Sequence, residues 1–152
     1  MFKEVEIFLP IKGKVLPLTE VEDYLFNRKI LGEGIAIEPE DNYIYSPVNG
    51  TVELVYEKKH VILISTEEGI KILIHLGLDS NNFGGKGIAC YINPGEKVSR
   101  GDKLIWFDKE YLAPQISLTT PVIIVNTELI KTLAINYNAY NTEDIIMKAV
   151  VY

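Results

Sequence analysis

The sequence has few residues that could form a disulfide or a metal cluster. It holds one cysteine, Cys90, and two histidines. A single thiol cannot form an intramolecular disulfide, and a lone cysteine suits a reducing compartment. No apolar stretch approaches the roughly 20 residues that cross a bilayer as a helix, and charge appears too early after Met1 for a secretory segment. We therefore expect a cytoplasmic protein that does not insert into a membrane.

An excess of basic residues is also missing. The chain has 15 lysines and arginines against 21 aspartates and glutamates, a formal net charge of -6. Nucleic acids and anionic membranes attract basic surfaces, so neither is expected as the main partner. Hydrophobic residues make up 47% and charged residues 24%, an ordinary globular balance. No linker or charge block divides the chain, which predicts a single domain over residues 1–152.

Helix signals are weak, and short strand-like runs dominate the chain. Runs rich in Val, Ile, Tyr and Phe alternate with turn residues, and some are apolar at consecutive positions, which is typical of strands covered on both faces. The pattern predicts an all-β sandwich or barrel with a few short helices. The expected strands include Thr51–Tyr56, Val61–Ser65, Ile70–His75, Lys103–Phe107 and Pro121–Val125. The expected helical segments are Glu20–Leu25, Asp108–Gln115 and Thr127–Leu133, the last being the best candidate.

Two segments resemble each other. Ser46–Val52 and Pro94–Asp102 both read as a tight turn followed by a strand. The resemblance is short and by itself indicates no function.

The two histidines flank a predicted hairpin. The runs Val61–Ser65 and Ile70–Ile74 are joined by a polar loop that ends in Gly69. If the hairpin is centred between Glu67 and Glu68, His60 lies opposite His75. Opposed residues project from one face with Cβ atoms about 5 Å apart, whereas a shift of one residue moves one histidine to the other face.

Facing imidazoles allow several kinds of chemistry. The pair can bind a metal, act as two bases, or let one ring act as a nucleophile while the other hydrogen-bonds the product. The alternative is that the two histidines are unrelated structural residues. The pattern of residues alone does not choose between these interpretations.

Several further segments, taken in order, carry a resemblance to a known family. The chain resembles the glucose-type enzyme IIA of bacterial sugar phosphotransferase systems from about Val5 to Asn126. The segments concerned are Lys29–Pro39, Ser46–Gly50, Lys59-His60, Ile72–Asp79, Gly85–Gly87, Gly95–Asp108 and Thr120–Asn126.

The resemblance implies a compact antiparallel β-sandwich of the barrel-sandwich, duplicated-hybrid-motif type, and a phosphoryl-carrier function. His75 would accept phosphate on Nε2 from the phosphohistidine of the histidine-containing phosphocarrier protein. It would then pass the phosphate to a cysteine of an enzyme IIB domain of a sugar permease. His60 would hydrogen-bond the phosphoryl group, and the Gly77 carbonyl would hold the other nitrogen of His75. No cofactor is implied, because the donor is already an activated phosphoramidate.

The resemblance also assigns supporting roles. Asp79 and Glu33 occupy positions expected to ring the site with acids. Lys58 stands where the family usually has a threonine that orients the first histidine. Ile35, Leu73 and Leu76 are most simply core residues, and any of them left exposed would form an apolar rim on which partners dock.

A second interpretation of the same residues concerns binding. The segment His75–Asp79 also fits the H-x-G-x-D pattern of zinc peptidases, but these need further histidines. We therefore expect no required metal, with adventitious zinc binding between His60 and His75. The alternative function is a regulatory module that uses the histidine face to dock targets or a metal.

Overall fold

The largest sheet of the structure, a computed structural model that describes residues 3–78 and 84–152, contains seven strands. All its pairings are antiparallel. Its strands in spatial order are β2 (Gly13–Pro17), β3 (Glu33–Pro39), β11 (Thr120–Ile124), β7 (Lys71–His75), β6 (Val61–Ser65), β5 (Gly50–Val55) and β9 (Lys97–Val98).

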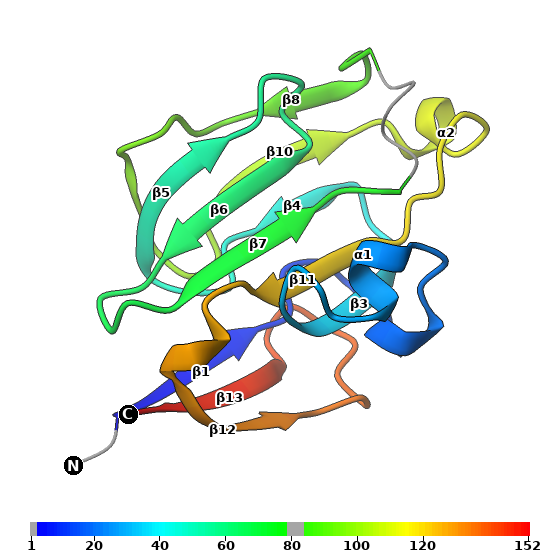
Figure 1. The fold of residues 1–152 in the computed structure, drawn as a ribbon. Coiled ribbons are helices and arrows are strands. Elements are labelled where there is room, and N and C mark those ends of the chain that lie inside the picture. The colour runs from blue at the N-terminus through cyan, green and yellow to red at the C-terminus, as the bar shows by residue number, and fades with distance from the viewer. Residues whose placement is uncertain (1–2, 79–83) are drawn as a thin grey trace.

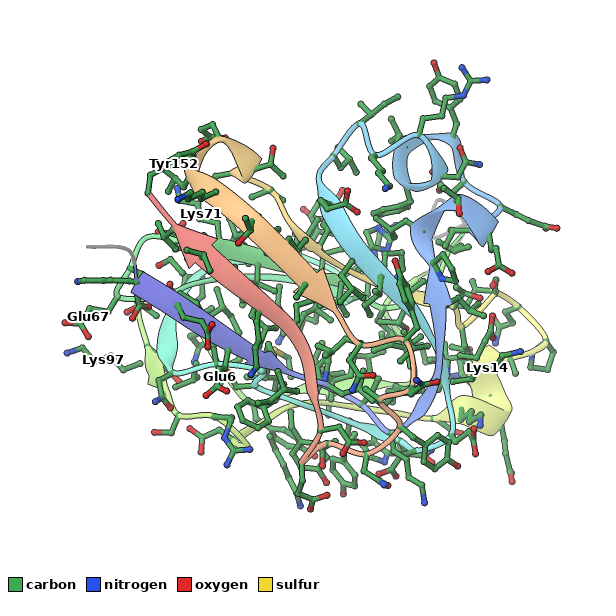
Figure 2. The ribbon with its side chains drawn as sticks, turned by 90° about the horizontal axis from the view of Figure 1, so that it is seen from below. Glu6, Lys14, Glu67, Lys71, Lys97 and Tyr152 are labelled. Atoms are coloured by element: carbon green, nitrogen blue, oxygen red, sulfur yellow. The ribbon has the colours of Figure 1, made fainter. Side chains whose placement is uncertain are left out.

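Two three-stranded antiparallel sheets complete the sandwich. The first lies behind β5, β6 and β7 in Figure 1, and the second lies below them. Figure 2, seen from below, shows the strands of the second sheet side by side, with Glu67 and Lys97 at the edge of the molecule. The strands of the first sheet are β4 (Tyr43–Tyr45), β10 (Lys103–Phe107) and β8 (Ile88–Cys90), and those of the second are β1 (Lys3–Phe8), β13 (Ile145–Val151) and β12 (Ile130–Ile135).

Two apolar clusters fill the molecule. The main core joins all three sheets, and alternation along β7 directs Ile72 and Ile74 into it. A second, smaller cluster takes the residues that alternate with these, including Leu73 of β7 and Ile123 of β11. The 3-10 turn η1 (Leu18–Glu20) and helix α1 (Tyr24–Asn27) cover this cluster. The sheet is therefore buried on both faces where β3, β11 and β7 meet.

The all-β prediction is confirmed, and most strand positions are close to those expected. The runs Val61–Ser65 and Lys103–Phe107 match β6 and β10 at both ends, and the expected strand Pro121–Val125 is β11, displaced by one residue. Helix α2 (Lys109–Leu112) lies inside the segment expected to be helical, and the Asp108 carboxylate accepts a hydrogen bond from the Tyr111 N–H at its start.

Two helix predictions need correction. The segment Thr127–Leu133 is not a helix: only the 3-10 turn η3 (Thr127–Leu129) forms, and β12 follows at once. Ile130, Thr132 and Ile135 are β-branched, and β12 pairs with β13, so tertiary pairing overrides the local helix signal. In the segment Glu20–Leu25, helix α1 starts at Tyr24, after the N-cap Asp23.

The two segments with similar turns lie against each other. Gly50 of β5 pairs with Val98 of β9. Ser46 N–H donates to the Asp102 carbonyl at 2.8 Å, and Gly101 N–H donates back to the Ser46 carbonyl at 2.9 Å. The two similar segments therefore correspond to two turns that form hydrogen bonds with each other.

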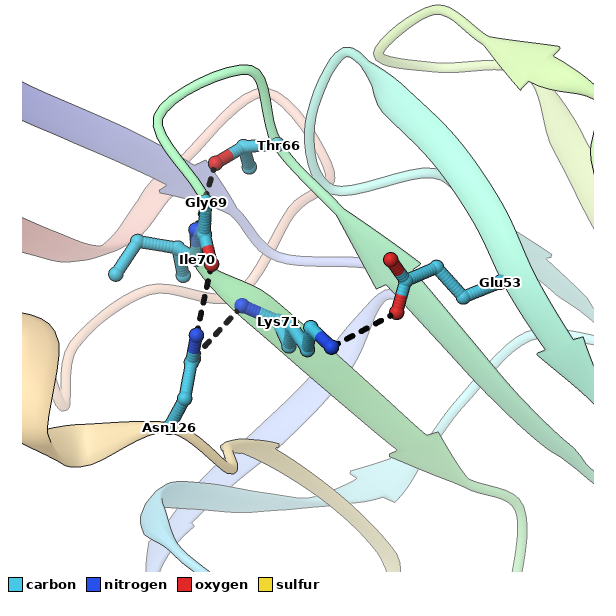
Figure 3. A network of polar contacts seen from close by, with 6 residues as sticks. All are labelled: Glu53, Thr66, Gly69, Ile70, Lys71 and Asn126. Atoms are coloured by element: carbon cyan, nitrogen blue, oxygen red, sulfur yellow. Dashed lines mark hydrogen bonds and ion pairs between the residues drawn. The ribbon is translucent and has the colours of Figure 1, made fainter.

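The hairpin β6–β7 is anchored at its loop end by Asn126 (Figure 3). The Asn126 side chain donates to the Gly69 carbonyl at 2.7 Å and accepts from Lys71 N–H at 2.9 Å. Thr66 Oγ1 accepts from Ile70 N–H at 3.2 Å, and Lys71 forms an ion pair with Glu53 of β5 at 3.3 Å. These bonds fix the strand that ends in His75.

In the ranges 3–78 and 84–152, no helix is long and apolar enough to cross a membrane.

Candidate functional site

The two histidine rings are in contact at the end of the β6–β7 hairpin. Their centroids are 5.5 Å apart and their planes stand at 89°. His60 is 3% exposed, whereas His75 is half-buried. The structure thus brings together the pair that the hairpin argument singled out.

The predicted register of the hairpin is nevertheless wrong by one residue. Val61, not His60, lies directly opposite His75. His60 precedes β6, and its carbonyl accepts a hydrogen bond from Leu76 N–H at 2.8 Å. Thr66 N–H bonds the Ile70 carbonyl, so the loop is one residue longer than the assumed turn. Next to His60 the backbone departs from a regular strand, since Lys59 has φ 65°.

The ring of His75 is held by its neighbouring loop. Its Nδ1 atom lies 2.7 Å from the Gly77 carbonyl oxygen. A carbonyl oxygen can only accept, so in the neutral ring the proton sits on Nδ1 and Nε2 is unprotonated. Gly77 itself has φ 78°, and a Cβ there would lie 2.8 Å from the Ser117 carbonyl oxygen. Glycine is therefore required for the loop that orients this nitrogen.

Two aromatic side chains that the sequence argument did not identify pack on the histidines. Phe26 of α1 contacts the His75 ring with centroids 5.4 Å apart, and Tyr56 contacts the His60 ring at 5.2 Å. Phe26 is only 3% exposed and belongs to the second apolar cluster. Helix α1 thus forms a lid over one side of His75.

Both imidazoles have lowered basicity. Burial lowers the pKa of His60 to about 4, helped by the nearby charges of His75 and Lys58. Burial also lowers the pKa of His75, opposed by the hydrogen bond to the Gly77 carbonyl and by the negative charge of Asp23. Near neutral pH the pair is uncharged, which leaves a lone pair available on each ring.

Lys58 precedes His60 by two residues, and its positive charge contributes to the low pKa of His60. Its side chain is half-buried. The loop that contains Gly85 passes over it, since a Cβ on Gly85 would stand 3.7 Å from the Lys58 carbonyl oxygen. A cation is therefore positioned near the histidines in place of a hydroxyl.

Of the two acids expected at the site, the structure describes Glu33. Its carboxylate accepts from Lys29 Nζ and from the Gly34 N–H, each at 3.1 Å. Asp79 lies outside the described residues, so the expected ring of acids stays a prediction. A further acid, Asp23, the N-cap of α1, acts on His75. The capping pattern before Tyr24 marks a helix start in the sequence, but nothing local connects that helix to His75.

The apolar residues that were candidates for a docking rim are buried or half-buried. Ile35 and Leu76 are 0% exposed and belong to the main core, which confirms the core interpretation and leaves neither residue a surface for the docking role. Leu73 is half-buried against the second cluster. Helix α1, whose Phe26 contacts His75, and the loop after it carry exposed apolar residues, a surface we call the α1 patch. It consists of Tyr24, Leu25, Ile30 and Leu31, which are 59%, 45%, 53% and 37% exposed.

A metal centre finds little support. Across residues 3–78 and 84–152, no group of three or more histidine, cysteine, aspartate and glutamate side chains could hold a metal ion. The two rings alone supply fewer ligands than a structural or catalytic zinc site uses.

The fold is similar to that of a solved structure, glucose permease IIA from Mycoplasma capricolum. The TM-score is 0.90 with 32% sequence identity, and the match covers 96% of each chain. This likeness, together with the contacting histidines, places the chain in the class of IIA-type phosphoryl carriers.

The particular family follows from the sequence comparisons. Residues 5–130 match the family described as phosphoenolpyruvate-dependent sugar phosphotransferase system, EIIA 1, and the chain belongs to this family. It is 41% identical over 130 residues to a glucose-specific EIIA component from Oceanobacillus iheyensis, covering 85% of this chain and 79% of the relative. A glucose-specific EIIA component from Buchnera aphidicola is 37% identical over 132 residues, covering 86% and 82%.

A third relative has a different architecture. The chain is 43% identical over 123 residues to a beta-glucoside-specific EIIBCA component from Bacillus subtilis, covering 80% of this chain but 20% of that protein. The chain is therefore a phosphoryl carrier of a sugar phosphotransferase system, whose relatives include fusions with EIIB and EIIC parts.

Proposed function

We propose that His75 is the phosphoryl acceptor, that its donor is the phosphohistidine of the histidine-containing phosphocarrier protein, and that the phosphate passes on to a cysteine of an enzyme IIB domain. The observation that carries the proposal is the 2.7 Å contact between His75 Nδ1 and the Gly77 carbonyl. This contact keeps the proton of the neutral ring on Nδ1, so Nε2 is the nitrogen with a free lone pair that can attack phosphorus.

The transfer requires no external proton. The Nε2 lone pair of His75 forms a bond to phosphorus while the phosphorus–nitrogen bond of the donor breaks, and the donor ring takes back that electron pair. The His75 ring then carries the phosphoryl group on Nε2 and the proton on Nδ1. Positive charge that develops on the ring is stabilised by the Gly77 carbonyl dipole and the Asp23 carboxylate. In the second step the cysteine thiolate attacks phosphorus and Nε2 regains its lone pair.

His60 takes the role of a partner to the phosphoryl group. Its ring contacts that of His75, and its pKa of about 4 keeps it neutral, so it has one N–H to donate to a phosphoryl oxygen. Lys58 adds the positive charge that a neutral imidazole lacks. No cofactor takes part, since both reactants are supplied by proteins.

The α1 patch is the surface on which these protein partners dock. Its exposed apolar residues surround the helix whose Phe26 covers His75. Apolar side chains at the centre of an interface exclude water from the transferring group. We infer that residues 1–152 act as one domain in the cytoplasm, where both partners present their reactive groups.

The test is phosphorylation by phosphoenolpyruvate and the two general phosphotransferase proteins, followed by intact-mass measurement. The unaltered chain gains one phosphoryl group, His75→Ala gains none, and His60→Gln accepts phosphate but fails to pass it to an EIIB domain. Normal phosphorylation of His75→Ala contradicts the assignment of the acceptor. If the unaltered chain stays unphosphorylated, the alternative of a regulatory binding module on this fold is favoured.

A further inference from the structure

The turn before His60 contains a residue in the left-handed backbone region. Lys59 has φ 65°, and Lys29, with φ 55°, is the only other non-glycine residue with positive φ within ranges 3–78 and 84–152. This conformation suits glycine and asparagine, whereas a residue with an ordinary side chain adopts it at a cost. A lysine held there indicates that the surrounding turn requires this geometry.

Hydrogen bonds define the turn. Lys59 N–H donates to the Tyr56 carbonyl at 2.7 Å, and Tyr56 N–H donates to the Val61 carbonyl at 2.9 Å. The bond from Tyr56 N–H to the Val61 carbonyl continues the ladder of β5 and β6, so residues 57–60 form the connection between the two strands. Lys59 and His60 therefore lie in the turn that precedes β6, and the Tyr56 and His60 rings are in contact.

The His60 side chain does not point where a regular strand would direct it. Along β6, Ile62 and Ile64 belong to the main core, while Val61 is paired with His75 and shares its face. A regular strand extended backward by one residue would point His60 toward the core with Ile62. Instead its ring contacts that of His75.

We propose that Lys59 is a positioning residue, whose left-handed backbone conformation, rather than its ammonium group, aims His60 at His75. A residue with positive φ at the end of a turn changes the direction in which the chain enters the following strand, and with it the direction of the next side chain. The position of His60 is thus set by a backbone conformation one residue away, at a site where the sequence shows an ordinary lysine.

The experiment compares two substitutions at position 59 and a matched control. Lys59→Val disfavours positive φ because valine is β-branched, and Lys59→Gly keeps positive φ accessible while removing the charge. Lys29→Val makes the same change at the other left-handed lysine, away from His60. The charged or titratable groups that act on His60, namely His75 and Lys58, stay the same in all three.

The readout is the titration of His60 by NMR. In the unaltered chain the pKa lies at about 4, and in Lys59→Val it moves up toward 6.5 because the ring leaves its buried position. Lys59→Gly and Lys29→Val leave the titration unchanged. If the proposed function holds, Lys59→Val also slows phosphoryl transfer to an EIIB domain roughly a hundredfold, while His75 still accepts phosphate. A loss of this size is expected when a catalytic group is displaced by about 1 Å.

The titration needs no phosphoryl donor, so its outcome is separate from that of the proposed function. An unchanged His60 titration in Lys59→Val overturns the inference, as does an equal shift in Lys59→Gly, which would assign the effect to charge. If Lys59→Val does not fold, an NMR measurement on the unaltered chain still tests the inference. Scalar couplings that show negative φ at Lys59, with ring-to-ring contacts between His60 and His75 retained, overturn the inference as well.

Discussion

At the scale of single residues, the surroundings of the two imidazoles determine their charge. Both rings are identical in chemistry, yet His60 is almost fully buried and His75 retains a hydrogen bond to a carbonyl and a nearby carboxylate. Desolvation disfavours the imidazolium of each. The unequal surroundings fit the unequal roles proposed above, with His75 as a neutral phosphoryl acceptor and His60 as a neutral hydrogen-bond donor.

Lys58 gives a first prediction at this scale. Replacing Lys58 by threonine removes a positive charge that disfavours protonation of His60, so the pKa of His60 rises from about 4. The lifetime of the phosphohistidine shortens, because the same cation favours the phosphoryl dianion. NMR titration of both histidines and the decay of the phosphorylated protein measure the two effects. Identical His60 titrations in the two proteins would mean that Lys58 is a solvated bystander.

The buried His60 also predicts how stability depends on pH. In the unfolded chain His60 binds a proton as the pH falls through its ordinary pKa of 6.5, whereas in the folded chain it does so only near 4. The unfolded state therefore binds more protons between these values, and the free energy of unfolding decreases as the pH falls. Between pH 7 and pH 5 the loss from this residue is about 2 kcal/mol.

Urea unfolding at pH 7 and pH 5 tests this linkage. His60→Gln removes the titrating group and should show a smaller pH dependence by about that amount. Equal pH dependence in the two proteins contradicts a buried, neutral His60.

At the scale of structural elements, the hairpin β6–β7 is the part that holds the proposed acceptor, His75. Its loop end is tied to Asn126 (Figure 3), and at its other end His75 contacts Phe26 of α1. Two different kinds of bond hold the loop end: a side-chain amide that satisfies two backbone groups, and the ion pair between Lys71 and Glu53.

These bonds should differ in their contribution to stability. Asn126→Ala leaves the Lys71 N–H and the Gly69 carbonyl without this partner and lowers the free energy of unfolding by about 1–3 kcal/mol. Lys71→Met removes an ion pair whose side chains are 44% and 36% exposed, and costs about 0–1 kcal/mol. Urea unfolding of the two variants measures the difference. An equal or larger loss in Lys71→Met would show that the ion pair, not the amide, anchors the hairpin.

At the scale of the whole molecule, the fold presents two imidazoles without the further ligands of a metal centre within the described residues. We therefore expect chelators to leave phosphoryl acceptance unchanged, because the reaction needs only the nitrogen of His75 and an activated donor. Phosphorylation assayed with and without a chelator, and again after zinc addition, checks this. Acceptance that is lost in chelator and restored by zinc would support a metal-dependent function.

Much of the strand framework could be predicted from the sequence alone. Short β-branched runs between turn residues located β6 and β10 at both ends, because alternating or continuous burial of such runs is a local property of the chain. The hairpin loop likewise made the two histidines neighbours. The order of the segments from Lys29 to Asn126 identified the family, which the comparisons confirm.

Other features were decided only by tertiary structure. Residues 18–26 cover His75 because the outer face of β3, β11 and β7 is apolar and needs burial, so Phe26 and Asp23 reach the site from far along the chain. Thr127–Leu133 became mostly strand through a pairing partner distant in sequence. Local patterns specify backbone preference and side-chain alternation, whereas the choice of which faces are covered depends on contacts that exist only once the sheets have assembled.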